Sequence, residues 1–148
     1  MIRVQVEPFD PAAELADFIA AVPGAGAVAS FVGLVRAETG RDAVSALELD
    51  HYPALTERAI ATIGEAARAR FELAGLVIVH RCGAMAPGEP IVFVAAAAAH
   101  RRAAFDAVDY MMDRLKTEAP FWKREHGPGG PRWIEARDAD LKDKARWG

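Results

Sequence analysis

The 148-residue sequence contains a single cysteine, Cys82, so it cannot form a disulfide within the chain. A lone thiol at the end of an apolar stretch is more often a core residue than a nucleophile. No apolar run approaches the roughly 20 residues of a membrane helix, and the sequence does not open with the basic and apolar regions of a secretory signal. We therefore expect a cytoplasmic protein with no membrane contact.

Metal and nucleotide motifs are missing as well. The four histidines are scattered, and neither a cysteine pair, a His-x-x-x-His spacing nor a glycine-rich phosphate loop occurs. Ser30 and Ser45 lack the surroundings of a hydrolase nucleophile. The net charge is −3, and the mild basic excess of residues 76–148 is too small to indicate nucleic acid as a partner. We expect neither a metal ion nor an organic cofactor.

Lysine is rare, because only Lys116, Lys123, Lys142 and Lys144 occur among the 18 basic residues. A lysine kept in a chain that otherwise uses arginine is a candidate for amine chemistry, since arginine cannot lose its proton in proteins. Lys142 and Lys144 belong to a charged tail and are better explained as solvated surface. Lys116 and Lys123 are therefore the candidate functional amines.

Hydrophobic periodicity divides the chain into strands and helices. Period-two alternation or a short apolar run predicts strands over residues 2–6, 27–35, 44–52, 75–81, 91–99, 121–125 and 132–136. Apolar stripes predict helices over residues 11–22, 53–71 and 100–118. This order predicts one α+β domain over residues 1–148, with a mostly antiparallel or mixed sheet. The charged tail, about residues 138–148, fits either a helix or a mobile segment.

The third predicted helix has a clear inner face. Its apolar stripe is formed by Ala104, Val108, Met111 and Leu115. Its outer face is expected to expose Arg102, Asp106, Asp109 and Asp113.

A polar group follows the predicted strand at 27–35. The run Phe31-Val32-Gly33-Leu34-Val35-Arg36 ends in an arginine, whose charge can point into a cleft at the mouth of the strand. Gly33 either permits close approach of a ligand or marks a β-bulge. A strand end that simply reaches solvent is the competing interpretation.

A second basic group, His100-Arg101-Arg102, opens the third predicted helix. Cations are unfavourable at a helix N-terminus, where the positive end of the dipole lies. Their presence makes sense if a phosphate or carboxylate binds there. Alternatively, acidic neighbours neutralise the arginines, the helix begins elsewhere, or His100 is a buried histidine.

The third group surrounds Pro120, which disfavours helix at the preceding residue. In the extended segment that follows, Phe121 and Lys123 share one face, whereas Trp122 and Arg124 share the other.

Lys116 and Lys123 lie on either side of that proline. The pKa of a free lysine amine is about 10.4, and burial or neighbouring cations such as Arg36 and Arg101 lower it. A lysine shifted in this way becomes a possible nucleophile or base. Lys116 has a simpler explanation as a partner of the helix C-terminal dipole.

Over about residues 27–138 the chain resembles the large, catalytic subunits of molybdopterin synthase, the MoaE family. The most specific matches are Leu115-Lys116-Thr117 and Ala119-Pro120-Phe121-Trp122-Lys123-Arg124-Glu125. The remaining matching stretches are Phe31–Arg36, Leu47–Pro53, Val79–Arg81 with Gly83, Pro87–Glu89, Ile91–Val94, Ala99–Arg101 and Arg132–Arg137.

This resemblance implies an α+β fold of the α/β-hammerhead type with an additional antiparallel β subdomain. It implies a homodimer of large subunits, each binding a small ubiquitin-like sulfur carrier with a C-terminal Gly-Gly thiocarboxylate, which gives a heterotetramer. The substrate would be cyclic pyranopterin monophosphate (precursor Z), and two sulfur transfers, in an order left open, would form the dithiolene of molybdopterin. No metal is implied for the large subunit.

The resemblance also implies site residues. Arg36, His100 and Arg101 resemble the residues that hold the pterin phosphate and line the pocket. Lys116 resembles the essential lysine near the donor thiocarboxylate, acting through a covalent adduct or through proton transfer, and Lys123 resembles the second active-site lysine. The implied substrate-binding set is Leu34, Val35, Arg36, His100, Arg101, Lys116, Lys123, Arg124 and Glu125, with only a backbone or packing role for Leu34.

A non-enzymatic function is also consistent with these basic residues. A non-catalytic dimeric module that binds a small anionic metabolite would need the arginines but no lysine amine. The behaviour of Lys116 and Lys123 therefore discriminates between the two.

Overall fold

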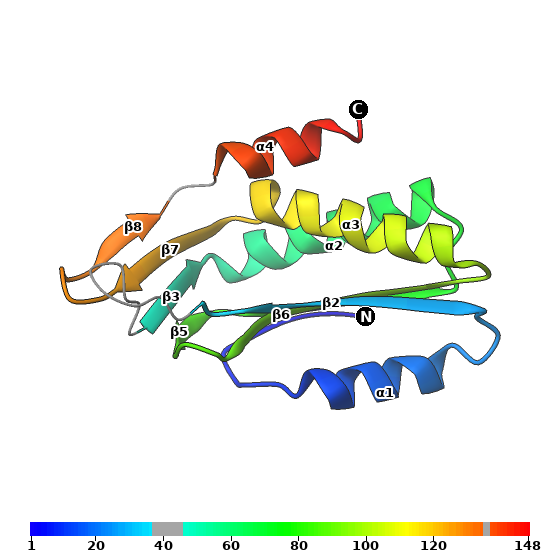
Figure 1. Ribbon diagram of the computed structural model, residues 1–148, viewed down its shortest axis with the longest axis horizontal. Coiled ribbons are helices and arrows are strands. Elements are labelled where there is room, and N and C mark those ends of the chain that lie inside the picture. The colour runs from blue at the N-terminus through cyan, green and yellow to red at the C-terminus, as the bar shows by residue number, and fades with distance from the viewer. Residues whose placement is uncertain (37–45, 135–136) are drawn as a thin grey trace.

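The computed structural model describes residues 1–36, 46–134 and 137–148, and contains two four-stranded sheets (Figure 1). The larger sheet has the order β1-β4-β6-β2, formed by β1 (Ile2–Gln5), β4 (Gly75–Arg81), β6 (Pro90–Ala98) and β2 (Ala27–Leu34). β1 pairs with β4 in parallel and the other pairs are antiparallel. β2 therefore forms one edge of this sheet.

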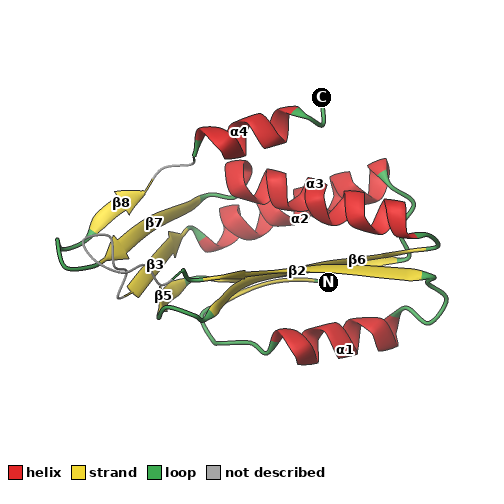
Figure 2. Ribbon diagram, in the orientation of Figure 1, coloured by secondary structure: helices red, strands yellow, loops and turns green. Residues whose placement is uncertain are grey.

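Helices cover both faces of the larger sheet (Figure 2). α1 (Pro11–Ala21), capped by Asp10, lies on one face, and α2 (Pro53–Arg70) and α3 (Arg101–Glu118) lie on the other. Because side chains alternate along a strand, Val77 and Val79 pack with Phe18 of α1, whereas Leu76 and Ile78 belong to the core beneath α2 and α3.

β6, which lies between β4 and β2, has small side chains along its last residues. β6 ends in Ala95–Ala98, and each of these alanines is at most 1% exposed. Alternate alanines face α1 and the α2–α3 layer. Strands buried on both faces give continuous apolar runs, so the buried strand predicted at 91–99 is confirmed.

The smaller sheet has the order β5-β3-β7-β8 and lies at one end of the larger sheet (Figure 1). It contains β5 (Gly83–Met85), β3 (Ala46–His51), β7 (Phe121–His126) and β8 (Arg132–Ile134), all paired antiparallel. Its core is Val35, Leu47, Leu49 and Met85. The sequence did not predict β5, because three residues carry no detectable periodicity.

The charged tail forms α4 (Asp138–Ala145), which packs on the outer side of α3. Arg146 Nη2 and Trp147 Nε1 each donate to Asp113 Oδ2 at 2.6 Å. Asp113 is 9% exposed, so the prediction that it faces solvent is wrong. The prediction failed because α4 supplies a second layer whose docking is not encoded in the α3 pattern.

These elements confirm the predicted α+β class with an additional antiparallel sheet. In the described part of the chain, none of the helices is long and apolar enough to cross a membrane.

Candidate active site

A cavity of about 220 Å³ lies where the two sheets meet the end of α3. Most of the residues on its wall are apolar, among them Phe31, Leu34, Leu49, Met112 and Phe121. The polar side chains on this wall are His80, Lys116, Thr117 and Lys123. An apolar pocket with a few convergent polar groups is the usual form of a small-molecule site.

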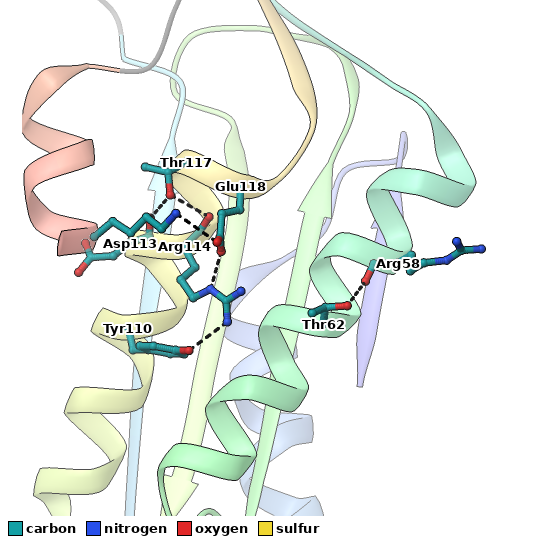
Figure 3. Close-up of polar contacts among 8 residues, drawn as sticks. Arg58, Thr62, Tyr110, Asp113, Arg114, Thr117 and Glu118 are labelled. Atoms are coloured by element: carbon teal, nitrogen blue, oxygen red, sulfur yellow. Dashed lines mark hydrogen bonds and ion pairs between the residues drawn. The ribbon is translucent and has the colours of Figure 1, made fainter. Parts of the chain in front are cut away.

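Lys116 reaches the cavity from the last turns of α3. The turn is held by its neighbours, because the Thr117 hydroxyl donates to the Asp113 carbonyl at 3.0 Å and Arg114 lies between Tyr110 and Glu118 (Figure 3). The side chain of Lys116 itself is exposed. The amine thus stands at the open side of the cavity on a fixed helical support.

The chain leaves α3 at Ala119 with extended backbone angles, as expected before Pro120. The buried Thr56 hydroxyl of α2 donates to the Pro120 carbonyl at 3.1 Å. This contact fixes the direction in which β7 begins, and therefore where Lys123 enters the site.

Lys123 lies on β7, in register with Leu49 of β3, and is partly buried. Burial is the main reason that the pKa of its amine falls from 10.5 to about 8, and the nearby charge of Lys116 lowers it further. Asp140 and Glu125 act in the opposite direction. The result is an amine that can exchange a proton near neutral pH.

The other face of β7 points away from the cavity. Arg124 Nη2 pairs with Glu48 Oε2 at 3.2 Å and Asp50 Oδ2 at 3.5 Å, and its guanidinium lies 4.9 Å from the Trp133 ring centroid. Trp122 is 44% exposed and packs edge-on against Tyr52. The predicted alternation along β7 is confirmed, and it places Arg124 outside the cavity beside Lys123. Glu125 does not line the cavity either.

The end of β2 contributes backbone and apolar surface. Gly33 lines the cavity, and a Cβ there would lie 2.8 Å from Val92 Cγ1, so a side chain would not fit. The register shifts between Gly33 and Leu34, which means that the bulge and the close approach occur together. Val35 is 3% exposed within the core of the smaller sheet, and neither it nor the exposed Arg36 lines the cavity.

His100 and Arg101 lie at the opposite end of α3 from the cavity. Arg101 and Lys116 are 15 residues apart on this helix, which corresponds to roughly 22 Å along its axis. The structure therefore does not bring them to the lysines within one chain. Both residues are exposed, and the first turn of α3 contains no acidic residue. The helix begins at Arg101 with His100 as its N-cap, one residue after the predicted start.

His80 belongs to the cavity wall but was not among the predicted site residues. It continues the row of Leu76 and Ile78 on β4 that faces the helices, and it is 9% exposed. Its ring stacks on Phe121 with centroids 4.2 Å apart and planes at 19°. A polar residue at the end of an otherwise apolar period-two row was the available sequence signal.

Cys82 is 2% exposed, and burial raises the pKa of its thiol, which fits the predicted core role. Among the described residues, no group of three or more histidine, cysteine, aspartate or glutamate side chains could hold a metal ion.

Comparison with known proteins identifies close relatives. The sequence model of the MoaE family, described as "MoaE protein", matches residues 4–118. A Caulobacter vibrioides protein named molybdopterin synthase catalytic subunit is 56% identical over 147 residues, covering 99% of this chain and 97% of that protein.

Solved structures of MoaE proteins are also similar to this chain. The molybdopterin biosynthesis MoaE protein from Burkholderia ambifaria is 47% identical, with a TM-score of 0.83 over 100% of this chain and 97% of that one. A Helicobacter pylori structure, titled a protein-protein complex of subunits 1 and 2 of molybdopterin-converting factor, is 22% identical, with a TM-score of 0.75 over 92% and 91% of the two chains. The latter similarity concerns the fold alone.

Proposed function

Because the chain belongs to the MoaE family, the catalytic subunits of molybdopterin synthase in molybdenum cofactor biosynthesis, we propose that it transfers sulfur from the C-terminal thiocarboxylate of a small ubiquitin-like subunit to cyclic pyranopterin monophosphate. Two such transfers form the dithiolene of molybdopterin. In each transfer, a carbon–sulfur bond replaces a carbon–oxygen bond on the substrate, whose oxygen leaves. One carbon–sulfur bond breaks in the donor, whose terminal carbon takes an oxygen from water and becomes a carboxylate.

One observation carries this proposal: two of the four lysines line one cavity whose other residues are mostly apolar. Lys116, on the open side, attracts the anionic donor end and either forms an adduct with it or moves a proton. Lys123, whose pKa is lowered to about 8, accepts or returns a proton as the carbon–sulfur bonds change. A module that only bound an anion would have no use for an amine shifted toward neutral pH, which favours the enzyme over the binding module.

The donor's tail must reach these lysines in an extended form. Glycines at its end suit a narrow passage, since they carry no Cβ. Phe121 contributes to the cavity wall, whereas Trp122 lies on the other face of β7 and does not. The Helicobacter pylori protein is titled as a complex of two subunits, which gives a two-subunit assembly a precedent in this fold. A cytoplasmic location belongs to the same proposal.

We further propose that the site is completed by a second large subunit. The lysines and the exposed His100 and Arg101 lie at opposite ends of α3. A two-fold pairing of antiparallel α3 helices would bring the basic end of one copy to the lysine end of the other. The edge strand β2 is suited to such a contact, because Phe31, Val32 and Leu34 are 37–55% exposed. Two large and two small subunits would then form the heterotetramer, with the phosphate of the pterin bound by Arg36 and the partner copy's basic end.

The decisive experiment combines the purified chain, the thiocarboxylated small subunit and cyclic pyranopterin monophosphate, and measures dithiolene product. A small subunit ending in an ordinary carboxylate is the control and should give none. A chain that binds both components but forms no dithiolene would refute the proposed reaction.

The shared site has its own test. Lys116→Arg and Arg101→Ala chains are unfolded together and refolded, so that mixed dimers form. Activity is measured at a substrate concentration well below the raised KM of Arg101→Ala, where each chain alone is of low activity. Mixed dimers contain one site with both wild-type residues, so activity should return. If each site lies within one chain, the mixture should be no more active than its components.

A further inference from the structure

The cavity has few side-chain hydrogen-bond acceptors. Protonated lysines donate hydrogen bonds but accept none, so Lys116 and Lys123 can recognise a phosphate or a thiocarboxylate but not an N–H group. The apolar residues on the wall can do neither. Among the described side chains on the wall, oxygen or nitrogen acceptors remain only on Thr117 and His80.

These two acceptors differ in position. The Thr117 hydroxyl donates to the carbonyl of Asp113, one turn earlier on α3, at 3.0 Å. This bond keeps its oxygen close to the helix backbone. His80 instead projects from β4 on the sheet side of the cavity and stacks on Phe121.

The hydrogen bonding of His80 determines which ring nitrogen is free. Nδ1 lies 2.8 Å from the Arg81 carbonyl oxygen, which can only accept, so Nδ1 carries the proton. Burial is the main reason that the pKa of His80 falls to about 4, and the charges of Lys123, Lys116 and His51 act in the same direction. Near neutral pH the ring is therefore uncharged and Nε2 keeps its lone pair. The structure gives Nε2 no hydrogen-bond partner among the described residues.

The orientation of the ring is fixed before any ligand arrives. The bond to the Arg81 carbonyl sets the ring's rotation, and the stack on Phe121, at 4.2 Å and 19°, sets its plane. An acceptor held in this way costs little ordering on binding. The same geometry presents a flat apolar surface beside the acceptor, which suits a flat heterocycle bearing N–H groups.

We propose that His80 is a substrate-binding, specificity-determining residue, whose Nε2 accepts a hydrogen bond from an N–H group of the pterin while the lysines bind the anionic groups. This inference rests on the proposed function, since it takes the pterin as the occupant of the cavity. It assigns the recognition of the heterocycle to the sheet side of the cavity and the recognition of charge to Lys116 and Lys123.

A spectroscopic test needs no variant in the protein that is measured. The complete chain, labelled with [15N]histidine, is titrated with cyclic pyranopterin monophosphate. The chain has four histidines, so the His80 signals are assigned by their loss in His80→Gln. The Nε2 resonance should shift as the pterin binds, because accepting a hydrogen bond changes the shielding of an unprotonated imidazole nitrogen. Saturating binding that leaves this resonance unmoved overturns the inference.

Binding measurements separate the acceptor from the ring. His80→Phe keeps an aromatic ring but removes Nε2, so the dissociation constant of the pterin should rise about 10-fold, the effect of one lost hydrogen bond. His80→Gln restores a polar acceptor near the position of Nε2 and should recover part of the loss. Thr117→Val, the matched control, should change the constant far less. In turnover assays His80→Phe should raise KM and largely keep kcat, which loss of the fold would not do.

The outcomes are distinguishable. A wild-type chain that does not bind the pterin refutes the proposed function, and the inference with it. Tight binding by wild type with equal affinity for His80→Phe refutes the inference alone. Should His80→Phe not fold, the titration of the wild-type chain still decides.

Discussion

Lys116 and Lys123 of the candidate site should be electrostatically coupled, and the coupling can be measured by changing one lysine and observing the pKa of the other. Among the neighbouring charges, that of Lys116 lowers the pKa of Lys123 the most. Lys116→Met removes that charge, so the pKa of Lys123 should rise above about 8 but stay below 10.5, because burial remains the larger cause. Lys116→Arg keeps the charge and should leave the pKa near its wild-type value.

The size of the effect follows from these pKa values. With a pKa of about 8, about one-tenth of the Lys123 amine is unprotonated at pH 7, compared with about 0.03% for an ordinary lysine. Each unit by which Lys116→Met raises the pKa therefore reduces the free amine about tenfold. Loss of activity in Lys116→Met would combine the missing Lys116 amine with a weakened Lys123, whereas Lys116→Arg isolates the amine.

The assay is a pH titration of [13C]lysine-labelled chain by nuclear magnetic resonance. Only four lysines contribute signals, and Lys123→Arg identifies the one of interest. Lys142→Met, in the exposed part of α4, is the control that should leave Lys123 unchanged. A wild-type Lys123 that titrates near 10.5, or a pKa that moves equally in Lys116→Met and Lys116→Arg, would refute the reasoning.

Three further predictions use other parts of the structure. Lys116→Arg should keep the fold, judged by its melting temperature, but lose most dithiolene formation, since arginine neither deprotonates nor forms an adduct; near-normal turnover would leave Lys116 an electrostatic role only. Arg101→Ala should raise KM by the equivalent of roughly 1.5–3 kcal/mol with kcat largely kept, and a collapsed kcat at unchanged KM would place Arg101 in the chemical step. Asp113→Ala should lower the free energy of unfolding by about 2 kcal/mol in urea titrations, because it leaves Trp147 Nε1 without its acceptor. The control is Asp109→Ala: Asp109 is exposed and also contacts Arg146, and its loss should lower the free energy of unfolding by less than about 1 kcal/mol. Equal losses in the two variants would contradict a structural role for α4 docking.

Long periodic segments could be predicted from the sequence, because the spacing of their apolar residues follows from the local geometry of a helix or strand. α3 and β6 were predicted to within a residue or two of their observed ends. The sheet orders could not be predicted, since pairing β1 with β4 joins residues more than 70 positions apart. The docking of α4 on Asp113 is non-local for the same reason.

In the candidate site, too, some residues could be identified from the sequence and others could not. Lys116 and Lys123 could be identified because both are exceptions in an arginine-rich chain and flank a proline. The separation of Arg101 from Lys116 was available in principle from helix geometry, and the outward direction of Arg124 from strand alternation. The role of His80 depends on its stack with Phe121, 41 positions away, and a contact of that kind is visible only once both sheets have formed.

The alanines of β6 also bear on which inherited changes this chain tolerates. Every alanine codon becomes a valine codon through one transition at its second base. At Ala95–Ala98, where each residue is at most 1% exposed, the two added methyl groups would push against α1 or the α2–α3 layer, at about 1–3 kcal/mol each. Random mutagenesis should therefore yield temperature-sensitive alleles at these codons, with intact active-site residues and activity that returns at lower temperature.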